Sequence, residues 1–86
     1  MTTVLILTAK GCIDCVRVKG IIIQASVEAH VPVTFKEMDI GSPEATDKAL
    51  LYGMNSVPSF VVKGKVFNTA NPNLKDLVSA LKSKAV

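Results

Sequence analysis

The first fifteen residues constrain the fold of this chain more than any other part of the sequence. A short and wholly apolar run, residues 4–7, is joined by a loop to a long helix-like run that starts near Cys12. A continuous run of β-branched and aliphatic residues is typical of a strand covered on both faces, at the centre of a sheet flanked by helices. We therefore expect a buried strand, a short loop and a helix.

The helix predicted from Cys12 to Ala29 carries apolar residues at three- and four-residue spacing. These residues are Val16, Val18, Ile22, Ala25 and Ala29. The dipeptide Val31-Pro32 ends the helix, because the residue before a proline avoids the helical conformation. Residues 33–39 then alternate as in a strand, and the charges of this strand favour a place near the edge of a sheet.

Two further helices are predicted from their capping residues. Ser42 is an expected N-cap, Pro43 follows at the first helical position, and Gly53 is the expected C-terminal stop. The last helix is predicted to follow a second cap, Asn71, with Pro72 in its first turn. The apolar face of this helix consists of Leu74, Leu77, Val78 and Leu81.

The remaining pattern is a hairpin. Pro58 opens a strand over residues 59–62, a two-residue turn follows at 63–64, and residues 65–68 return as the partner strand. The element order is β-α-β-α-β-β-α, in which the first unit should be a right-handed parallel crossover. We expect one small α/β domain over residues 1–86, with a four-stranded mixed sheet flanked by helices.

A Cys-x-x-Cys pair, Cys12 and Cys15, lies at the junction of the first strand and the first helix. At such a junction in a βαβ unit this spacing is a redox-site signature. Positions three apart share one face of a helix, so the two sulfurs can form a disulfide without unwinding it. The first cysteine also lies where unpaired N–H groups and the positive end of the helix dipole favour a thiolate. The pattern predicts a dithiol-disulfide oxidoreductase.

The cysteine pair, the element order and the proline that opens the third strand together resemble the thioredoxin-fold superfamily, over essentially the whole chain. The small size is similar to the glutaredoxin branch, which includes glutaredoxin-like proteins that supply electrons to ribonucleotide reductase and behave as thioredoxins. The resemblance implies that Pro58 is cis and packs against the active-site disulfide. The N–H and C=O of Val57 would then be free to pair with an extended substrate strand.

The resemblance also implies the roles of the two cysteines. Cys12 would be the exposed nucleophile that forms a mixed disulfide with the substrate, and Cys15 the buried thiol that resolves it. The substrate-binding residues that we expect are Lys10, Gly11, Ile13, Val57 and Pro58. Lys10 could contact an anionic partner or a glutathione carboxylate, and an ordinary solvated loop lysine is an equal alternative.

The chain departs from both branches of the superfamily in several places. Ile13 and Asp14 stand between the cysteines, where glutaredoxins usually have Pro-Tyr and thioredoxins Gly-Pro. Glutaredoxins usually hold glutathione with a Gly-Gly pair and an acidic residue after the fourth strand, and residues 68–73 here are NTANPN. This stretch is closer to the thioredoxin-like hydrogen donors. The electron donor, thioredoxin reductase or glutathione, stays open.

Asp14 is the candidate residue for tuning the acidity of the site. A carboxylate beside Cys12 opposes thiolate formation and raises the pKa of the thiol, whereas Lys10, Arg17 and the helix terminus act in the opposite direction. An Asp14 side chain that points to solvent has only a small, screened effect. Our hypothesis is a modest shift toward a reducing, thioredoxin-like reduction potential.

Composition limits the other function classes. The net charge of +3 is mild, and one Tyr, three Phe and no Trp leave little material for stacking nucleic-acid bases. No apolar run approaches the roughly 18 residues of a membrane span, and the N-terminus lacks the pattern of a signal peptide. Two cysteines this close in sequence suit a reducing cytosol better than a secreted, disulfide-stapled domain. We expect a cytoplasmic monomer.

The expected partners are a disulfide-containing protein substrate, with ribonucleotide reductase as one example, and thioredoxin reductase or glutathione as the reductant. No tightly bound cofactor and no four-ligand zinc site are expected, since the chain has no second cysteine pair. Two alternatives remain. Soft-metal chaperones also bind Cu(I) through two thiolates after an apolar strand, and a thioredoxin fold can serve in binding alone.

Overall fold

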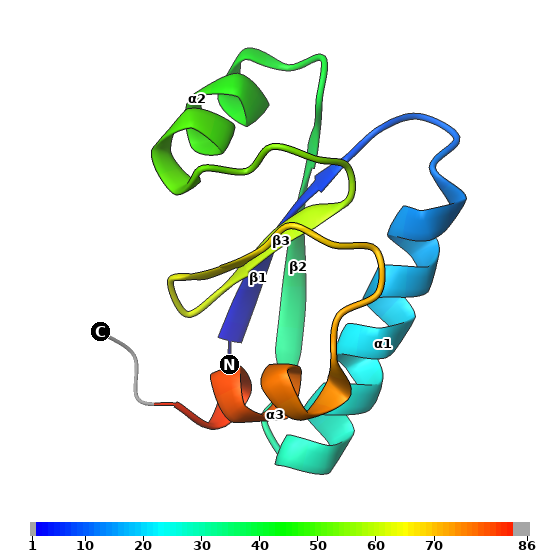
Figure 1. Ribbon diagram of the computed structural model, residues 1–86, viewed down its shortest axis with the longest axis vertical. Helices are drawn as coiled ribbons and strands as arrows, with labels where there is room; N and C mark the ends of the chain where they lie inside the picture. Colours follow the sequence, from blue (N-terminus) through cyan, green and yellow to red (C-terminus); the bar gives the residue numbers. More distant parts are fainter. Residues whose placement is uncertain (1, 84–86) are drawn as a thin grey trace.

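A four-stranded mixed sheet forms the centre of the protein, and three helices cover its two faces (Figure 1). The computed structural model describes residues 2–83. The strands are β1 (Thr2–Thr8), β2 (Val33–Asp39), β3 (Ser59–Val62) and β4 (Lys65–Phe67), and the helices are α1 (Ile13–Ala29), α2 (Pro43–Tyr52) and α3 (Leu74–Lys82). The order along the chain is the predicted β-α-β-α-β-β-α, and the architecture is that of the α/β thioredoxin-like fold.

The strands are arranged in the order β2-β1-β3-β4. The central strand β1 pairs in parallel with β2 and antiparallel with β3. This arrangement confirms the parallel first unit and the edge position of β2. The β3–β4 hairpin turns at Lys63 and Gly64, whose φ angles of 48° and 85° are left-handed. Such values suit a tight hairpin turn, and glycine adopts them without a steric penalty.

Two apolar clusters hold the helices on the sheet. The larger cluster lies between the sheet and the pair α1 and α3, and its fully buried residues are Val4, Ile6, Val18, Ile22, Ala25, Phe60, Val62, Leu77 and Leu81. The smaller cluster lies beneath α2 and contains Leu7, Met38, Ala45, Met54 and Val61. Strand β1 contributes to both clusters, which explains its uninterrupted apolar sequence.

The capping residues fix where the helices begin and end. Ser42 caps α2, because its Oγ accepts a hydrogen bond from the amide of Ala45 at 3.2 Å, and Gly53 closes it with a left-handed φ of 71°. The predicted cap of the last helix is wrong by two residues. Asn73, not Asn71, caps α3, and its Oδ1 accepts the first free amides of the helix. The preceding proline therefore lies outside the helix.

Helix α1 buries the expected face with one exception. Cys15, Val18 and Ile22 are buried as predicted, whereas Val16 is 67 % exposed. The helix also contains Gly20, where an added Cβ would meet no atom within 4 Å. A glycine in a helix interior costs about 1 kcal/mol relative to alanine. Within the described residues, neither a turn nor a close contact accounts for this glycine.

Among residues 2–83, no helix has the length and apolar character that a membrane crossing requires.

An ion pair at the surface links helix α2 to the edge strand β2. Lys36 on β2 and Glu44 in the first turn of α2 lie 2.8 Å apart. The hydrogen bond and the positive charge of Lys36 hold the pKa of Glu44 below its ordinary value.

This ion pair predicts a pH-dependent part of the stability. Because the pKa of Glu44 is lowered by folding, its contribution is present above the ordinary glutamate pKa and is lost as the pH falls through the folded-state pKa. We expect Glu44→Gln to lower the thermal midpoint slightly at neutral pH and to have no effect in acid. Melting curves across the acidic range measure this difference. In a Lys36→Met background the effect of Glu44→Gln should be smaller, because only the weaker attraction of Lys48 and of the helix terminus remains. An effect of unchanged size in this background, or a pH-independent difference, would contradict the assignment.

Candidate redox site

A short loop after β1 places Cys12 at the start of α1. Gly11 adopts a left-handed φ of 76°, and the amide of Cys12 donates a hydrogen bond to the carbonyl of Ala9 at 3.2 Å. Cys12 is the N-cap residue, with extended backbone angles of −78° and 101°. The chain thus turns directly from the central strand into the helix.

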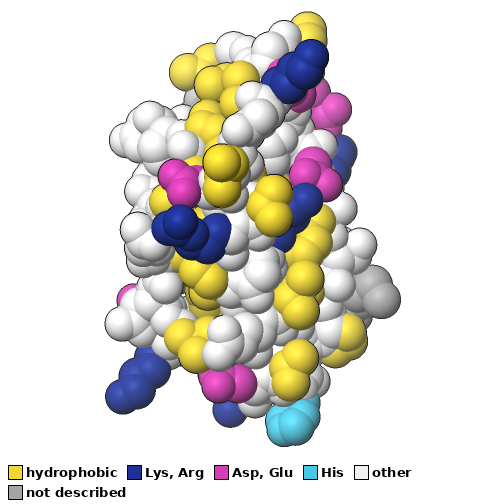
Figure 2. All heavy atoms as spheres, turned by 90° about the vertical axis from the view of Figure 1, so that its right-hand side faces the viewer, with side chains coloured by type: hydrophobic (Ala, Val, Ile, Leu, Met, Phe, Trp, Pro, Cys, Tyr) yellow, Lys and Arg dark blue, Asp and Glu magenta, His cyan; other side chains and the backbone are white. Residues whose placement is uncertain are grey.

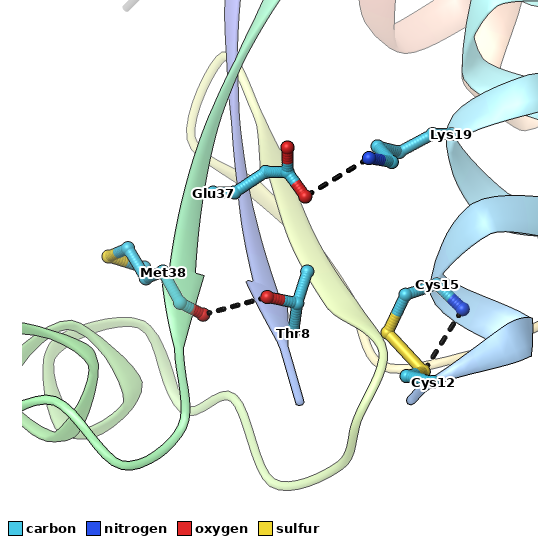
Figure 3. A network of polar contacts seen from close by, with 6 residues as sticks. All are labelled: Thr8, Cys12, Cys15, Lys19, Glu37 and Met38. Atoms are coloured by element: carbon cyan, nitrogen blue, oxygen red, sulfur yellow. Dashed lines mark hydrogen bonds and ion pairs between the residues drawn. A yellow bond between two sulfur atoms is a disulfide. The ribbon is translucent and has the colours of Figure 1, made fainter. Parts of the chain in front are cut away.

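Cys12 and Cys15 are joined by a disulfide, as Figure 3 shows, and their Cα atoms lie 5.3 Å apart. The two sulfurs have different surroundings. Cys15 faces the protein interior and is only 4 % exposed, while Cys12 is half-buried at the helix end. The amide of Cys15 donates a hydrogen bond to Sγ of Cys12 at 3.0 Å.

This arrangement favours a thiolate on Cys12 when the disulfide is reduced. An N–H group at the first turn of a helix is not used by the helix itself, so it can stabilise a negative charge on the N-cap side chain. The positive end of the helix dipole acts in the same direction. Cys15 lacks these advantages because it lies in the buried first turn. The sequence-based difference between the two cysteines therefore has a geometric basis.

A shallow hollow of about 400 Å³ lies beside the disulfide. Both cysteines line it, and Gly11, Ile13 and Val16 contribute to its walls. The far wall is polar, because Lys19 of α1 and Glu37 of β2 form an ion pair there at 3.0 Å (Figure 3). This hollow is large enough for part of an extended peptide next to Cys12.

Lys19 and Glu37 line this hollow but are not among the site residues predicted from the sequence. Two signals point to them. Lys19 follows Cys15 by four residues and so lies on the same side of the helix. Glu37 alternates with Val33 and Phe35, which pack toward the α1 side of the sheet.

The predicted substrate-binding residues do not all meet at this hollow. Gly11 and Ile13 line it, and the exposed Lys10 lies in the same loop. Val57 instead lines a separate apolar hollow of about 320 Å³ beneath α2. Pro58 is buried next to the start of β3.

The pairing of β3 with β1 nevertheless places Pro58 at the same end of the sheet as the loop between β1 and Cys12. Ser59, the next residue, pairs with Leu7 near the end of β1, from which the loop to Cys12 departs. The Val57–Pro58 peptide bond is cis, as the resemblance implies. Figure 1 shows the segment before β3 and the β1–α1 loop at the same end of the sheet.

Asp14 points to solvent and does not line the hollow. Its side chain is 53 % exposed, and its nearest cation is Arg17, 3.8 Å away on the next turn. Of the two orientations that the sequence leaves open, the structure has the one with a screened carboxylate. The Asp14 charge is therefore partly compensated and lies in a medium of high dielectric constant.

In the described part of the chain, no group of three or more His, Cys, Asp or Glu side chains is placed to hold a metal ion. Of these residue types, Cys12, Cys15 and Glu37 line the hollow, and Glu37 is paired with Lys19. The soft-metal chaperones considered above lack a helix between their second and third strands, where this chain has α2.

No family model and no curated protein matches this chain. Among solved structures, one described as the structure of a malarial protein is similar, with a TM-score of 0.60 and 16 % sequence identity. The match covers 95 % of this chain and 94 % of that chain. At this identity the likeness shows the shared fold and nothing about activity.

The exposure of Asp14 predicts a small effect on the redox site. Exposed ion pairs contribute about 0.2–1 kcal/mol, which corresponds to at most about 20 mV for a two-electron couple. We expect Asp14→Asn to shift the reduction potential of the cysteine pair by no more than this, measured by equilibration with glutathione redox buffers. A shift several times larger would show that the carboxylate acts directly on Cys12. Asp76→Asn, in the first turn of α3, is the matched control.

Proposed function

We propose that this protein is a dithiol-disulfide oxidoreductase that reduces the disulfides of protein substrates. One observation carries the proposal. Cys12 is an accessible N-cap residue whose sulfur receives an amide hydrogen bond, and Cys15 is a buried cysteine within bonding distance of it. An activated outer thiol next to a protected inner thiol is what a two-step exchange reaction requires.

The reaction has two exchange steps. The Cys12 thiolate attacks one sulfur of the substrate disulfide, a Cys12–substrate bond forms, and the other substrate sulfur leaves as a thiolate. Cys15 then loses its proton and attacks Sγ of Cys12, which releases the second substrate sulfur. The substrate gains two electrons and two protons, and the protein is left with the Cys12–Cys15 disulfide. The described structure corresponds to this oxidised form.

An external reductant must return two electrons for the next cycle. Thioredoxin reductase and glutathione are the two candidates, and a reducing cytosol supplies either one. We propose a protein disulfide such as that of ribonucleotide reductase as the substrate, on the basis of the family resemblance. The chemistry needs no tightly bound cofactor, since the cysteine pair carries the electrons itself.

The segment after β4 favours thioredoxin reductase over glutathione. Glutaredoxins usually hold glutathione in this region, but here Asn68 is occupied within the protein. Its Oδ1 accepts the amide of Asn55 at 3.0 Å, and its Nδ2 donates to the carbonyl of Gly53 at 3.2 Å. Thr69 is also engaged, because its Oγ1 accepts the amide of Asn71 at 3.0 Å. These side chains support the turn between β4 and α3 and the end of α2.

Turnover of a disulfide substrate tests the proposal. Reduction of insulin would be followed by NADPH consumption in two parallel reactions, one with thioredoxin reductase and one with glutathione and glutathione reductase. We expect turnover with thioredoxin reductase, complete loss of activity in Cys12→Ser, and a trapped mixed disulfide with substrate in Cys15→Ser. Ser79→Ala, an exposed change on α3, serves as the matched control.

Melting curves of the reduced proteins would establish that each variant is folded. Turnover only with glutathione would show that glutathione, not thioredoxin reductase, is the reductant. The proposed reduction of protein disulfides would still hold. Two results would contradict the proposed function: a reduced, folded protein without turnover in either reaction, or a Cys12→Ser variant with normal turnover. In the first case, Cu(I) titration of the reduced cysteine pair would test the metal-binding alternative.

A further inference from the structure

Helix α1 has a second apolar face that nothing in the described chain covers. Its side chains are Ile13, Val16, Ile23 and Val27, which are 79 %, 67 %, 50 % and 68 % exposed. Together with Gly20 they form a line along the helix, which we call the α1 stripe. At 3.6 residues per turn, the stripe lies nearly opposite the face that packs on the sheet. In Figure 2 the side of the molecule that carries α1 faces the viewer, and hydrophobic side chains (yellow) extend along this side.

Gly20 occupies the midpoint of the α1 stripe. A Cβ at this position would meet no atom of the described chain within 4 Å, so the fold itself does not require a glycine there. A glycine on an exposed helix face permits another backbone to approach closely. The position of Gly20 therefore indicates an approach from outside the chain.

The spacing of the α1 stripe is nearly symmetric about Gly20. Ile13 and Val16 lie seven and four residues before it, and Ile23 and Val27 lie three and seven residues after it. When two such helices cross in antiparallel orientation at Gly20, Ile13 of one copy faces Val27 of the other, and Val16 faces Ile23. Each contact then occurs twice, as in an isologous two-fold interface. We propose that the α1 stripe pairs with the same stripe of a second copy of this chain.

The charges beside the α1 stripe favour the antiparallel orientation. In this arrangement Glu28 of the second copy lies level with Cys12, between the exposed Lys10 and Arg17. Glu28 also lines a third hollow, of about 550 Å³, beside Lys75 and Lys82 of α3. Within residues 2–83, Glu28 forms no ion pair with either lysine or with any other cation. The negative end of each helix dipole also faces the positive end of the other. A parallel pairing would instead place like charges and like helix ends together.

The size of the α1 stripe determines the strength of this pairing. From Ile13 to Val27 the stripe is about 21 Å long. A standard stable interface buries about 800 Å² of each partner, and the area of a single helix face of this length is smaller. The dimer should therefore be weak and depend on concentration. It differs from the monomer expected from the sequence, and it does not rest on the redox chemistry of the cysteine pair.

Sedimentation equilibrium of the oxidised protein tests the dimer between about 10 µM and about 1 mM. We expect the mass to rise from 9.1 kDa toward twice that value. Gly20→Glu should weaken association at least tenfold, because it places two carboxylates at the crossing point. Glutamate is a good helix former and its Cβ has free space, so the thermal midpoint at low concentration should not fall. Val27→Glu should weaken association similarly.

Leu50→Glu is the matched control, since Leu50 is 81 % exposed on α2, away from the α1 stripe. This variant should associate like the wild type. A wild-type mass of 9.1 kDa at every concentration would overturn the proposal. Undiminished association of Gly20→Glu, or an equal loss in Leu50→Glu, would place the interface elsewhere and overturn it too. Disulfide turnover of the same samples reports separately on the proposed function.

Cross-linking tests the antiparallel register. In a background with Cys12→Ser and Cys15→Ser, chains that carry Ile13→Cys are mixed with chains that carry Val27→Cys and are oxidised. The proposal predicts disulfides mainly between the two kinds of chain, because these positions face one another. Disulfides only within each kind would show a parallel pairing and contradict the proposal. Leu50→Cys mixed with either chain should give background cross-linking.

Discussion

Burial of β1 on both faces is the constraint on which the rest of the structure depends. Val4 and Ile6 pack toward α1 and α3, while Leu7 packs toward α2. The strand therefore lies at the centre of the sheet, and both the loop to Cys12 and the segment before Ser59 are placed at its end. The site is built on the most deeply buried part of the molecule, which positions the cysteines on a rigid base.

The sequence predicts those features that depend on local chemistry. The apolar strand at residues 4–7, the Ser42 cap and the Gly53 stop all have a direct local cause and are found in the structure. The cap of α3 is different, because Asn71 and Asn73 flank one proline and are equally good capping residues. The choice of Asn73 depends on where Leu77 must lie to pack in the core.

Three features of the site and of α1 depend on more than the types of the residues. Val16 fits the apolar period of α1 but belongs to the outward α1 stripe, because a helix with two apolar faces gives two overlapping patterns. The orientation of Asp14 depends on its pairing with Arg17, which residue types alone leave open. The separation of Val57 from the disulfide hollow depends on how α2 packs on the sheet. Ile13 lies both beside Cys12 and in the α1 stripe, so self-association and substrate access would compete for this residue.

The most direct test of the account is the reactivity of the two thiols. The reduced protein would be treated with limiting iodoacetamide across a range of pH, and the modified cysteines would be located by peptide mass spectrometry. We expect modification of Cys12 at least tenfold faster than that of Cys15, with the difference retained at a pH where unperturbed thiols are mostly protonated. Equal rates, or faster modification of Cys15, would contradict the assignment of Cys12 as the nucleophile.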